Sequence, residues 1–211
     1  MRTRVKICGI TRPEDGRAAA QVGADAIGLV FYAKSPRFVA LQQAHQICRE
    51  LPPFVSVVAL FVNAARERVE EVLKAVPVDL LQFHGEERAE QCLGFGRPYI
   101  KAIAMRKGSD PVSVMKAHPE ASGYLFDAWQ PQIHGGGGVT FDWAQMPRYT
   151  AKPMILAGGL TPDNVSCAVT QTQPFAVDVS SGVELDKGIK SVEKMQAFMR
   201  GVERGDASQV K

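Results

Sequence analysis

Cys8 and Asp127 are the two side chains in this sequence best suited to move protons. Cys8 ends a short apolar run that begins at Val5, and Gly9 follows it directly. Asp127 follows the apolar run 124–126 in the same way. A thiol and a carboxyl that flank one small substrate can remove a proton at one atom and deliver it at another, which is general acid–base catalysis. The alternatives are structural, because a free cysteine is often a small buried hydrophobe and a loop carboxylate is often only solvated.

Two turns rich in glycine and serine form a candidate phosphate site. A pair of glycines follows the apolar run 154–157, and two serines and a glycine follow the run 175–179. Glycines in such turns let backbone N–H groups approach a phosphate closely, although paired glycines can also do no more than form a turn. The residues expected to contact the substrate here are Gly158, Gly159, Asp178, Ser180, Ser181 and Gly182.

Arg37 and His84 are further candidates for substrate binding. Pro36 stiffens the chain before Arg37 and so favours a fixed guanidinium that anchors an anion. His84 lies at the end of a short apolar run, where its imidazole would either position the substrate or bond to a neighbouring carbonyl group. His45 and His118 fall in helical or loop segments and are expected at the surface. We expect no metal site, because the His and carboxylate residues do not show ligand spacing.

Composition excludes several classes of protein. The 211 residues are 45% hydrophobic and 22% charged, and the net charge of +3 comes from scattered basic residues, which does not indicate a nucleic-acid partner. The four cysteines lie far apart without a CxxC pair, which is typical of reduced thiols. The N-terminal apolar run is too short for a signal peptide, and no run approaches the ~18 residues of a membrane span. We therefore expect a cytoplasmic monomer or homodimer that binds a small anionic molecule and has no membrane partner.

Short apolar runs recur along the chain, and most are continuous rather than alternating. Such runs are typical of parallel strands covered on both faces. Helical patterns fill the gaps, so eight strand–helix units predict an α/β fold, a (β/α)₈ TIM barrel of one domain over residues 1–204 with a polar tail over 205–211. An open doubly wound sheet is the alternative, but no GxGxxG follows the first run. The predicted strands are 5–8, 26–31, 55–62, 79–83, 99–103, 124–126, 154–157 and 175–179.

Capping residues predict where the helices begin and end. Thr11 with Glu14 fits a capping box, and Thr161 precedes a proline that fits the first turn of a helix. Asn63 and Ser191 are further candidate N-caps, and the glycine at 23 is a plausible helix stop.

The carboxyl ends of the strands are where a barrel of this kind builds its site, so the candidate residues are expected to converge there. The segment 128–141 follows Asp127 and contains four consecutive glycines, 135–138. It is interpreted either as a loop that closes over the substrate or as a simple connection.

The ordered set of motifs resembles the phosphoribosylanthranilate isomerase family over residues 4–203. Any one motif is weak, whereas the set with its order and spacing is specific. The motifs are Lys6-Ile7-Cys8-Gly9-Ile10-Thr11, Ser35-Pro36-Arg37, Leu60-Phe61-Val62-Asn63, Leu81-Gln82-Phe83-His84-Gly85, Phe126-Asp127, Ala157-Gly158-Gly159-Leu160 and residues 177–184.

The resemblance implies a cofactor-free Amadori rearrangement in tryptophan biosynthesis. Asp127 would be the general acid that opens the ribose ring, and Cys8 the general base that removes the proton from C2′. Arg37 would anchor the anthranilate side of the substrate, and the backbone around Gly159 and residues 181–182 would hold the phosphate. From the residues themselves, Lys6 lies two positions before Cys8 and therefore on the same side of a strand, where its charge could help the thiol act as a base.

Two departures from the family pattern and two rival readings remain. Gly137 stands where the family usually has a threonine, and the segment 101–106 has alanine where an arginine is common. One rival is the related histidine-pathway isomerase, or a bifunctional barrel that acts on both substrates; these barrels use an aspartate where this chain has Cys8. The other is a barrel that binds a sugar phosphate without catalysis, which would not need both Cys8 and Asp127.

Overall fold

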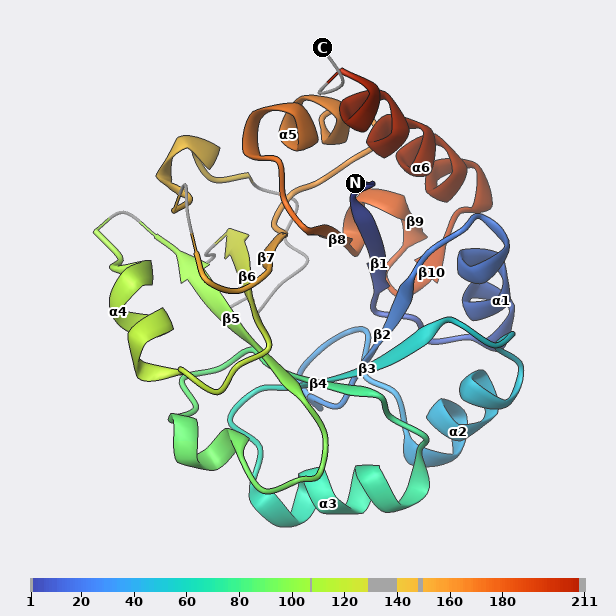
Figure 1. Ribbon diagram of the computed structural model, residues 1–211. Helices are drawn as coiled ribbons and strands as arrows, with labels where there is room; N and C mark the ends of the chain where they lie inside the picture. The colour runs from blue at the N-terminus through green and yellow to red at the C-terminus, as the bar shows by residue number, and fades with distance from the viewer. Residues whose placement is uncertain (1, 107, 129–139, 148–149, 209–211) are drawn as a thin grey trace.

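The eight predicted strands form a closed parallel barrel in the computed structural model, which describes residues 2–106, 108–128, 140–147 and 150–208 (Figure 1). The strands follow one another around the barrel in chain order, and β1 closes it by pairing with β8. Each observed strand overlaps a predicted apolar run, so the predicted fold is confirmed. The strands are β1 (Arg4–Cys8), β2 (Ala26–Val30), β3 (Ser56–Phe61), β4 (Leu80–Phe83), β5 (Tyr99–Met105), β6 (Gly123–Ala128), β7 (Met154–Leu156) and β8 (Ala176–Val179).

Helices surround the barrel, but among the described residues not every strand is followed by an α-helix. In the described part of the chain, β4 and β5 are joined through the short 3-10 helix η1 (Ala89–Cys92), and β6 and β7 through η2 (Trp143–Gln145). A shorter helical cover leaves room beside β5, which matters for the site. The α-helices are α1 (Pro13–Gln21), α2 (Leu41–Arg49), α3 (Arg66–Ala75), α4 (Pro111–Ala117), α5 (Val165–Thr172) and α6 (Val192–Ala207).

The predicted cap at Ser191 is confirmed, since its hydroxyl accepts a hydrogen bond from the Lys194 N–H at 3.2 Å at the start of α6. The glycine at 23 directly follows the C-cap of α1, with φ of +92°, as a helix stop requires. Helix α6 continues to Ala207, so its last turn lies inside the segment expected to be a polar tail.

The caps predicted at Thr11, Asn63 and Thr161 are wrong. Helix α1 begins at Pro13, and the Thr11 hydroxyl donates to the Gly188 carbonyl instead. The side-chain oxygen of Asn63 accepts from Glu86 N–H in a neighbouring loop. At Thr11 and at Asn63, the side chain that would cap a helix is instead hydrogen-bonded to a residue distant in sequence. Thr161 precedes a turn fixed by the side chain of Asn164, and α5 begins only at Val165.

Most of the hydrophobic core lies between the barrel and its helices, and a smaller cluster fills part of the barrel interior. The interior cluster is formed by Ile100, Ala102, Leu125, Ile155, Ala157 and Ala176. The ends of β1 to β3 near the mouth form a third small cluster that includes Cys8. The interior also contains a buried ion pair, because Lys6 Nζ lies 2.9 Å from Asp178 Oδ1. The site is therefore built where an apolar core gives way to paired charges.

A two-stranded hairpin follows β8 and its short 3-10 helix η3 (Ser181–Val183). Its strands are β9 (Glu184–Asp186) and β10 (Ile189–Lys190), which pair antiparallel. Figure 1 shows the hairpin beside β1 and β2, at the same side as α1. The Lys190 N–H donates to Asp15 of α1, so the hairpin is bonded to the first strand–helix unit.

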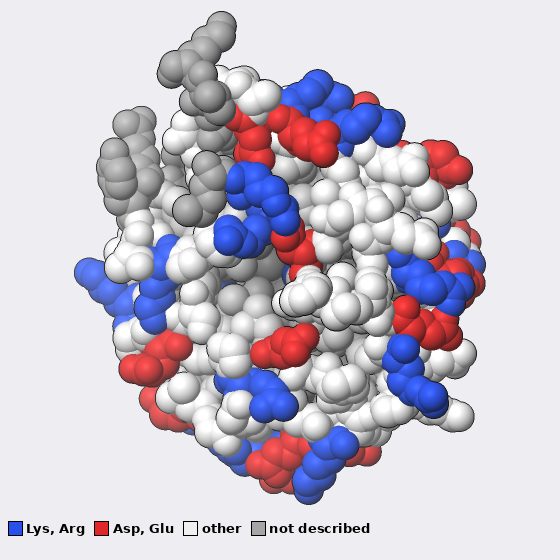
Figure 2. Space-filling view, turned by 45° about the vertical axis from the view of Figure 1, so that its right-hand side comes forward, with Lys and Arg blue, Asp and Glu red and all other residues white. Residues whose placement is uncertain are grey.

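Acidic and basic side chains are interspersed over the described part of the face shown in Figure 2. This distribution agrees with the small net charge, and a large patch of one sign is not visible on that face. The described part of this face therefore does not show the basic stripe expected of a nucleic-acid interface.

The close packing of α6 on α5 generates a test of the fold. An added Cβ at Gly205 would lie 2.7 Å from Val169 Cβ and 2.9 Å from the Ser166 carbonyl oxygen. Helix propensity alone favours alanine by about 0.5–1 kcal/mol, whereas overpacking costs about 1–3 kcal/mol. We expect Gly205→Ala to lower the free energy of unfolding in urea by about 1–3 kcal/mol.

Glu203→Ala is the matched control, because Glu203 is exposed on the same helix. Its effect should stay within about 0.5 kcal/mol. A Gly205→Ala variant that is more stable than the parent would show that α5 and α6 are not packed as described.

Candidate active site

Cys8 lies at the carboxyl end of β1, where a glycine of the next strand makes room for it. The residue is 6% exposed, and its register partner on β2 is Gly28. A Cβ at Gly28 would lie 2.7 Å from Cys8 Sγ and 3.1 Å from Lys6 Cε. Gly28 is thus a functional position that the sequence interpretation missed. The sequence signal for it is a glycine inside an apolar strand, which often marks a position where another group approaches the strand backbone closely.

The pKa of Cys8 is set by burial and by three charged neighbours. Burial is the largest cause and raises the pKa of the thiol, because a thiolate loses its hydration there. The Lys6 and Lys190 ammonium groups lower it, and the Asp178 carboxylate raises it. The net pKa is raised. Lys6 does lie beside the thiol, as expected from its position on the strand, but its charge does not outweigh the loss of solvent.

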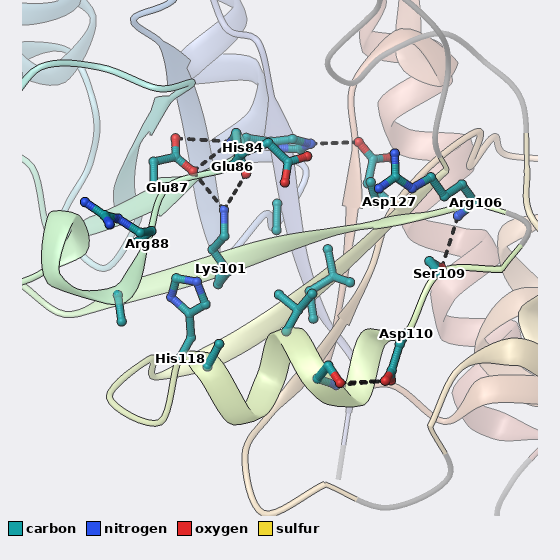
Figure 3. A pocket seen from close by; sticks show the side chains of 18 of the residues that line it. His84, Glu86, Glu87, Arg88, Lys101, Arg106, Ser109, Asp110, His118 and Asp127 are labelled. Atoms are coloured by element: carbon teal, nitrogen blue, oxygen red, sulfur yellow. Dashed lines mark hydrogen bonds and ion pairs between the residues drawn. The ribbon is translucent and has the colours of Figure 1, made fainter.

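Asp127, on β6, accepts a hydrogen bond from His84, which directly follows β4. His84 Nε2 lies 2.9 Å from Asp127 Oδ2 (Figure 3). His84 Nδ1 lies 2.8 Å from Gln82 Nε2. Gln82 is completely buried, while the side chains of His84 and Asp127 are 11% and 8% exposed. Asp127 is therefore not a solvated loop carboxylate. His84 contacts the candidate acid directly, which the sequence could not indicate.

The turn that carries His84 is held from below by a buried ion pair. Lys101 Nζ lies 2.8 Å from Glu87 Oε2 and donates to the Gly85 carbonyl at 2.6 Å. Glu87 also accepts from the Gly85 and Asn63 N–H groups. Figure 3 shows Lys101 pointing at this turn from β5. The backbone around His84 is consequently fixed by several charge-assisted bonds.

Arg37 is buried and paired rather than free. Its Nε and Nη2 donate to the Glu184 carboxylate at 2.8 and 2.7 Å, and Lys190 Nζ lies 2.7 Å from the same carboxylate. Burial alone would lower the pKa of Arg37, but the bonds to Glu184 outweigh it and the pKa is raised. Burial alone would raise the pKa of Glu184, but Arg37 and Lys190 hold it below its usual value. The hairpin after β8 thus positions the guanidinium.

The turn after β7 contains two glycines with positive φ, and the turn after β8 contains a buried hydroxyl without a partner among the described residues. Gly158 and Gly159 have φ of +81° and +63°, a region that favours glycine. A Cβ at Gly158 would lie 2.3 Å from the Ala128 amide nitrogen and 2.9 Å from Asp127 Oδ1. The Ser180 hydroxyl is buried and has no hydrogen-bond partner among the described residues. An unpaired donor at this position is suited to an anionic ligand.

Two cavities meet at His84 and Asp127. The inner one, of about 50 Å³, opens between the strand ends, and the outer one, of about 680 Å³, lies between the η1 segment, β5 and α4. Figure 3 shows the outer cavity, with Arg106 and Asp110 among the residues that line it. The structure brings nine of the ten predicted site residues to the inner cavity: Cys8, Arg37, His84, Asp127, Gly158, Gly159, Asp178, Ser180 and Ser181.

Gly182 is the predicted residue that does not line this cavity. A Cβ there would lie 1.9 Å from the Leu160 carbonyl oxygen, so a glycine is needed for the turns after β7 and β8 to pack this closely. Asp178 lines the cavity but is already paired with Lys6. Gly137 and the predicted glycine-rich loop lie outside the described residues over 129–139.

The described residues contain no group of three His, Cys, Asp or Glu side chains that could bind a metal ion. No α-helix in the described part of the chain is long and apolar enough to cross a membrane.

Comparison with known proteins agrees with this geometry. The family model described as N-(5′-phosphoribosyl)anthranilate (PRA) isomerase matches residues 5–201. A curated relative from Nitrosococcus oceani, named N-(5′-phosphoribosyl)anthranilate isomerase, is 58% identical over 203 residues, which is 96% of this chain and 98% of the relative. The crystal structure of the phosphoribosylanthranilate isomerase from Thermotoga maritima has a TM-score of 0.85 at 39% identity, covering 95% of this chain and 98% of that one.

A further solved structure is similar and contains a ligand. It is a phosphoribosylanthranilate isomerase in complex with reduced 1-(o-carboxyphenylamino)-1-deoxyribulose 5-phosphate, with a TM-score of 0.82 and 37% identity. The alignment covers 95% of this chain and 98% of that chain.

The environment of Cys8 predicts how its thiol titrates. Because burial disfavours the charged thiolate, the ultraviolet absorbance of the Cys8 thiolate should appear only above pH 9.0, the ordinary value for a cysteine. The difference between wild-type protein and Cys8→Ser isolates this signal from the other thiols.

Removing Lys6 and Asp178 together avoids leaving a buried unpaired charge. In Lys6→Met/Asp178→Asn we expect the midpoint at still higher pH, because Lys6 has the larger effect of the two. A midpoint below pH 9.0 in the wild-type protein, or no change in the double variant, would contradict this account of the thiol.

Proposed function

The chain belongs to the N-(5′-phosphoribosyl)anthranilate isomerase family, and we propose that Cys8 and Asp127 catalyse the isomerisation at the mouth of its barrel. The reaction is the Amadori rearrangement of N-(5-phosphoribosyl)anthranilate to 1-(2-carboxyphenylamino)-1-deoxyribulose 5-phosphate, a step of tryptophan biosynthesis. The observation that supports these roles most directly is that a thiol and a carboxyl line one small cavity together with the turns after β7 and β8.

The first proton transfer opens the ring of the substrate. Asp127 donates a proton to the ribose ring oxygen, the C1′–O bond breaks, and the lone pair of the anthranilate nitrogen forms a C1′=N bond that carries a positive charge. Asp127 is left as a carboxylate. Its position at the carboxyl end of β6, with little exposure to water, favours a directed proton transfer over exchange with solvent.

The second proton transfer completes the rearrangement. The Cys8 thiolate removes the proton from C2′, and the electron pair of that C–H bond forms the C1′=C2′ bond of an enolamine while the C1′=N electrons return to nitrogen. The enolamine then tautomerises to the ketone. Because the ring-opened intermediate is cationic at nitrogen, it favours the thiolate at the moment when the base is needed. Lys6 and Lys190 act in the same direction.

The two anionic ends of the substrate are assigned to two separate sets of donors that line the inner cavity. The turns at Gly158–Gly159 and Ser180–Ser181 would bind the phosphate, because their glycine backbone and the unpaired Ser180 hydroxyl supply donors. Arg37 would hold the anthranilate side through Nη1, which Glu184 leaves available. Two fixed anchors would hold C2′ at the thiol, and this orientation accelerates the reaction.

Organisation and location complete the proposal. One domain, residues 1–204, would carry the whole reaction, in a chain that acts in the cytoplasm as a monomer or homodimer. The closed barrel and the lack of a membrane-spanning helix among the described residues are compatible with this assignment.

A direct assay tests the function. Purified protein mixed with phosphoribosylanthranilate, without added metal, should remove the fluorescence of that substrate at a rate proportional to enzyme concentration. A trace that does not differ from buffer would refute the proposed function.

Substitution tests the two proposed roles separately. We expect Cys8→Ala and Asp127→Asn each to lower kcat by roughly a hundred- to ten-thousand-fold, the usual contribution of a positioned acid or base. Cys167→Ala is the matched control for the thiol, because Cys167 is exposed on α5. A rate within a few fold of wild type in a folded Cys8→Ala or Asp127→Asn protein would remove that residue from the mechanism.

A further inference from the structure

A buried chain of three polar side chains leads to the proposed acid. Gln82, His84 and Asp127 are joined by contacts of 2.8 and 2.9 Å. His84 is the one side-chain partner of Asp127 among the described residues, and the Oε1 atom of Gln82 is buried with no partner in the same part of the chain. Buried polar atoms are seldom unpaired, so an orphan amide oxygen beside an imidazole needs a functional explanation.

We propose that His84 supplies protons to Asp127 and that the Gln82 amide determines which nitrogen of His84 carries hydrogen. Gln82 and His84 are thus positioning residues that act through Asp127. This inference rests on the proposed role of Asp127 as general acid, and it extends that role to the source of the proton.

In the observed arrangement Asp127 has no proton to donate. Gln82 Nε2 can only donate, so His84 Nδ1 must accept and cannot carry hydrogen. The neutral imidazole then carries its hydrogen on Nε2, which donates to Asp127 Oδ2. Asp127 accepts in this arrangement as a carboxylate, and a carboxylate has no proton to give to the ribose ring oxygen.

Rotation of the Gln82 side-chain amide by half a turn gives the arrangement in which Asp127 has a proton to donate. Oε1 then accepts from His84 Nδ1–H, which satisfies the atom that is unpaired in the observed one. One proton enters from water, and it is shared across the contact between His84 Nε2 and Asp127 Oδ2. When Asp127 gives a proton to the ring oxygen, an Nε2 lone pair faces a carboxylate, and His84 takes up the next proton from water.

The surroundings give water a route to His84 while keeping its backbone fixed. His84 and Asp127 line both cavities, and the outer one is large enough for many water molecules. The Lys101–Glu87 pair holds the turn at Gly85. The amide of Gln82 is therefore the part of the chain that can change partners. The charged or titratable groups that line the inner side are Cys8, Tyr32, Arg37 and Asp178. Those that line the outer side are Glu86, Glu87, Arg88, Glu90, Lys101, Arg106, Asp110 and His118.

Nitrogen-15 NMR of His84 tests the role of Gln82 without any assay of activity. In the free wild-type protein we expect hydrogen on Nε2 and a bare Nδ1. Gln82→Glu offers only an acceptor and should place hydrogen on Nδ1. Gln82→Met, of similar size and apolar, removes the partner and serves as a second variant should the buried glutamate impair folding. The same tautomer of His84 in all three proteins would overturn the assignment to Gln82.

Steady-state kinetics test whether His84 acts through Asp127. His84→Gln keeps an N–H donor for Asp127 but cannot carry an added proton. We expect it to lower kcat by about a hundredfold, with KM changed by no more than about threefold. In an Asp127→Asn background the same substitution should change kcat by less than about twofold, because the residue through which it acts is gone.

The matched control is His45→Gln, since His45 is exposed on α2, and its kcat should equal that of the wild-type enzyme. A His84→Gln enzyme with normal kcat would show that a hydrogen bond is sufficient and would overturn the proton-supply role. Equal losses in the wild-type and Asp127→Asn backgrounds would show that His84 contacts the substrate by itself. Absence of isomerase activity in the wild-type protein would refute the proposed function instead, and the NMR result would still decide the role of Gln82.

Discussion

Closure of the barrel between β1 and β8 is the constraint on which the site depends. The register of this pair places Lys6 opposite Asp178, residues that are 172 positions apart in sequence, and their ion pair of 2.9 Å lies inside the barrel. The same closure brings Cys8 beside the turn after β8. A sheet that remained open between these strands would leave Lys6 and Asp178 as two separate buried charges, which is a costly arrangement. Closure of the barrel therefore also determines the environment of the Cys8 thiol.

Three buried sets of charges then fix the loops around the mouth. Lys6–Asp178 lies in the interior, Arg37–Glu184–Lys190 joins the loop after β2 to the hairpin after β8, and Lys101–Glu87 holds the turn of His84. Such pairs offset their own desolvation only with good geometry, so they contribute little net stability. What they provide is a rim whose side chains are already in place before a substrate binds, which is the requirement of a site that works by positioned proton transfer.

The proposed acid, Asp127, and the proposed base, Cys8, occupy different surroundings on the same rim. Cys8 is enclosed by apolar strand ends and the ammonium groups of Lys6 and Lys190, which oppose the effect of burial on its pKa. Asp127 is bonded to an imidazole that reaches toward an open cavity. In the proposed mechanism, the group that loses its proton thus lies near cations, and the group that regains one lies near a titratable neighbour with access to water. Different environments would give the two side chains the opposite roles proposed for them within one cavity.

The sequence by itself determined the strands and the chemistry at their ends. Continuous apolar runs located all eight strands, since parallel strands covered on both faces have no polar face, and the barrel geometry then sent Cys8 and Asp127 to one rim. Helix starts at Thr11 and Thr161 were mispredicted, and only tertiary structure decided them. It also decided the need for Gly28 and the partners of Arg37 and His84. These features depend on distances between residues far apart in the chain, which local sequence patterns do not encode.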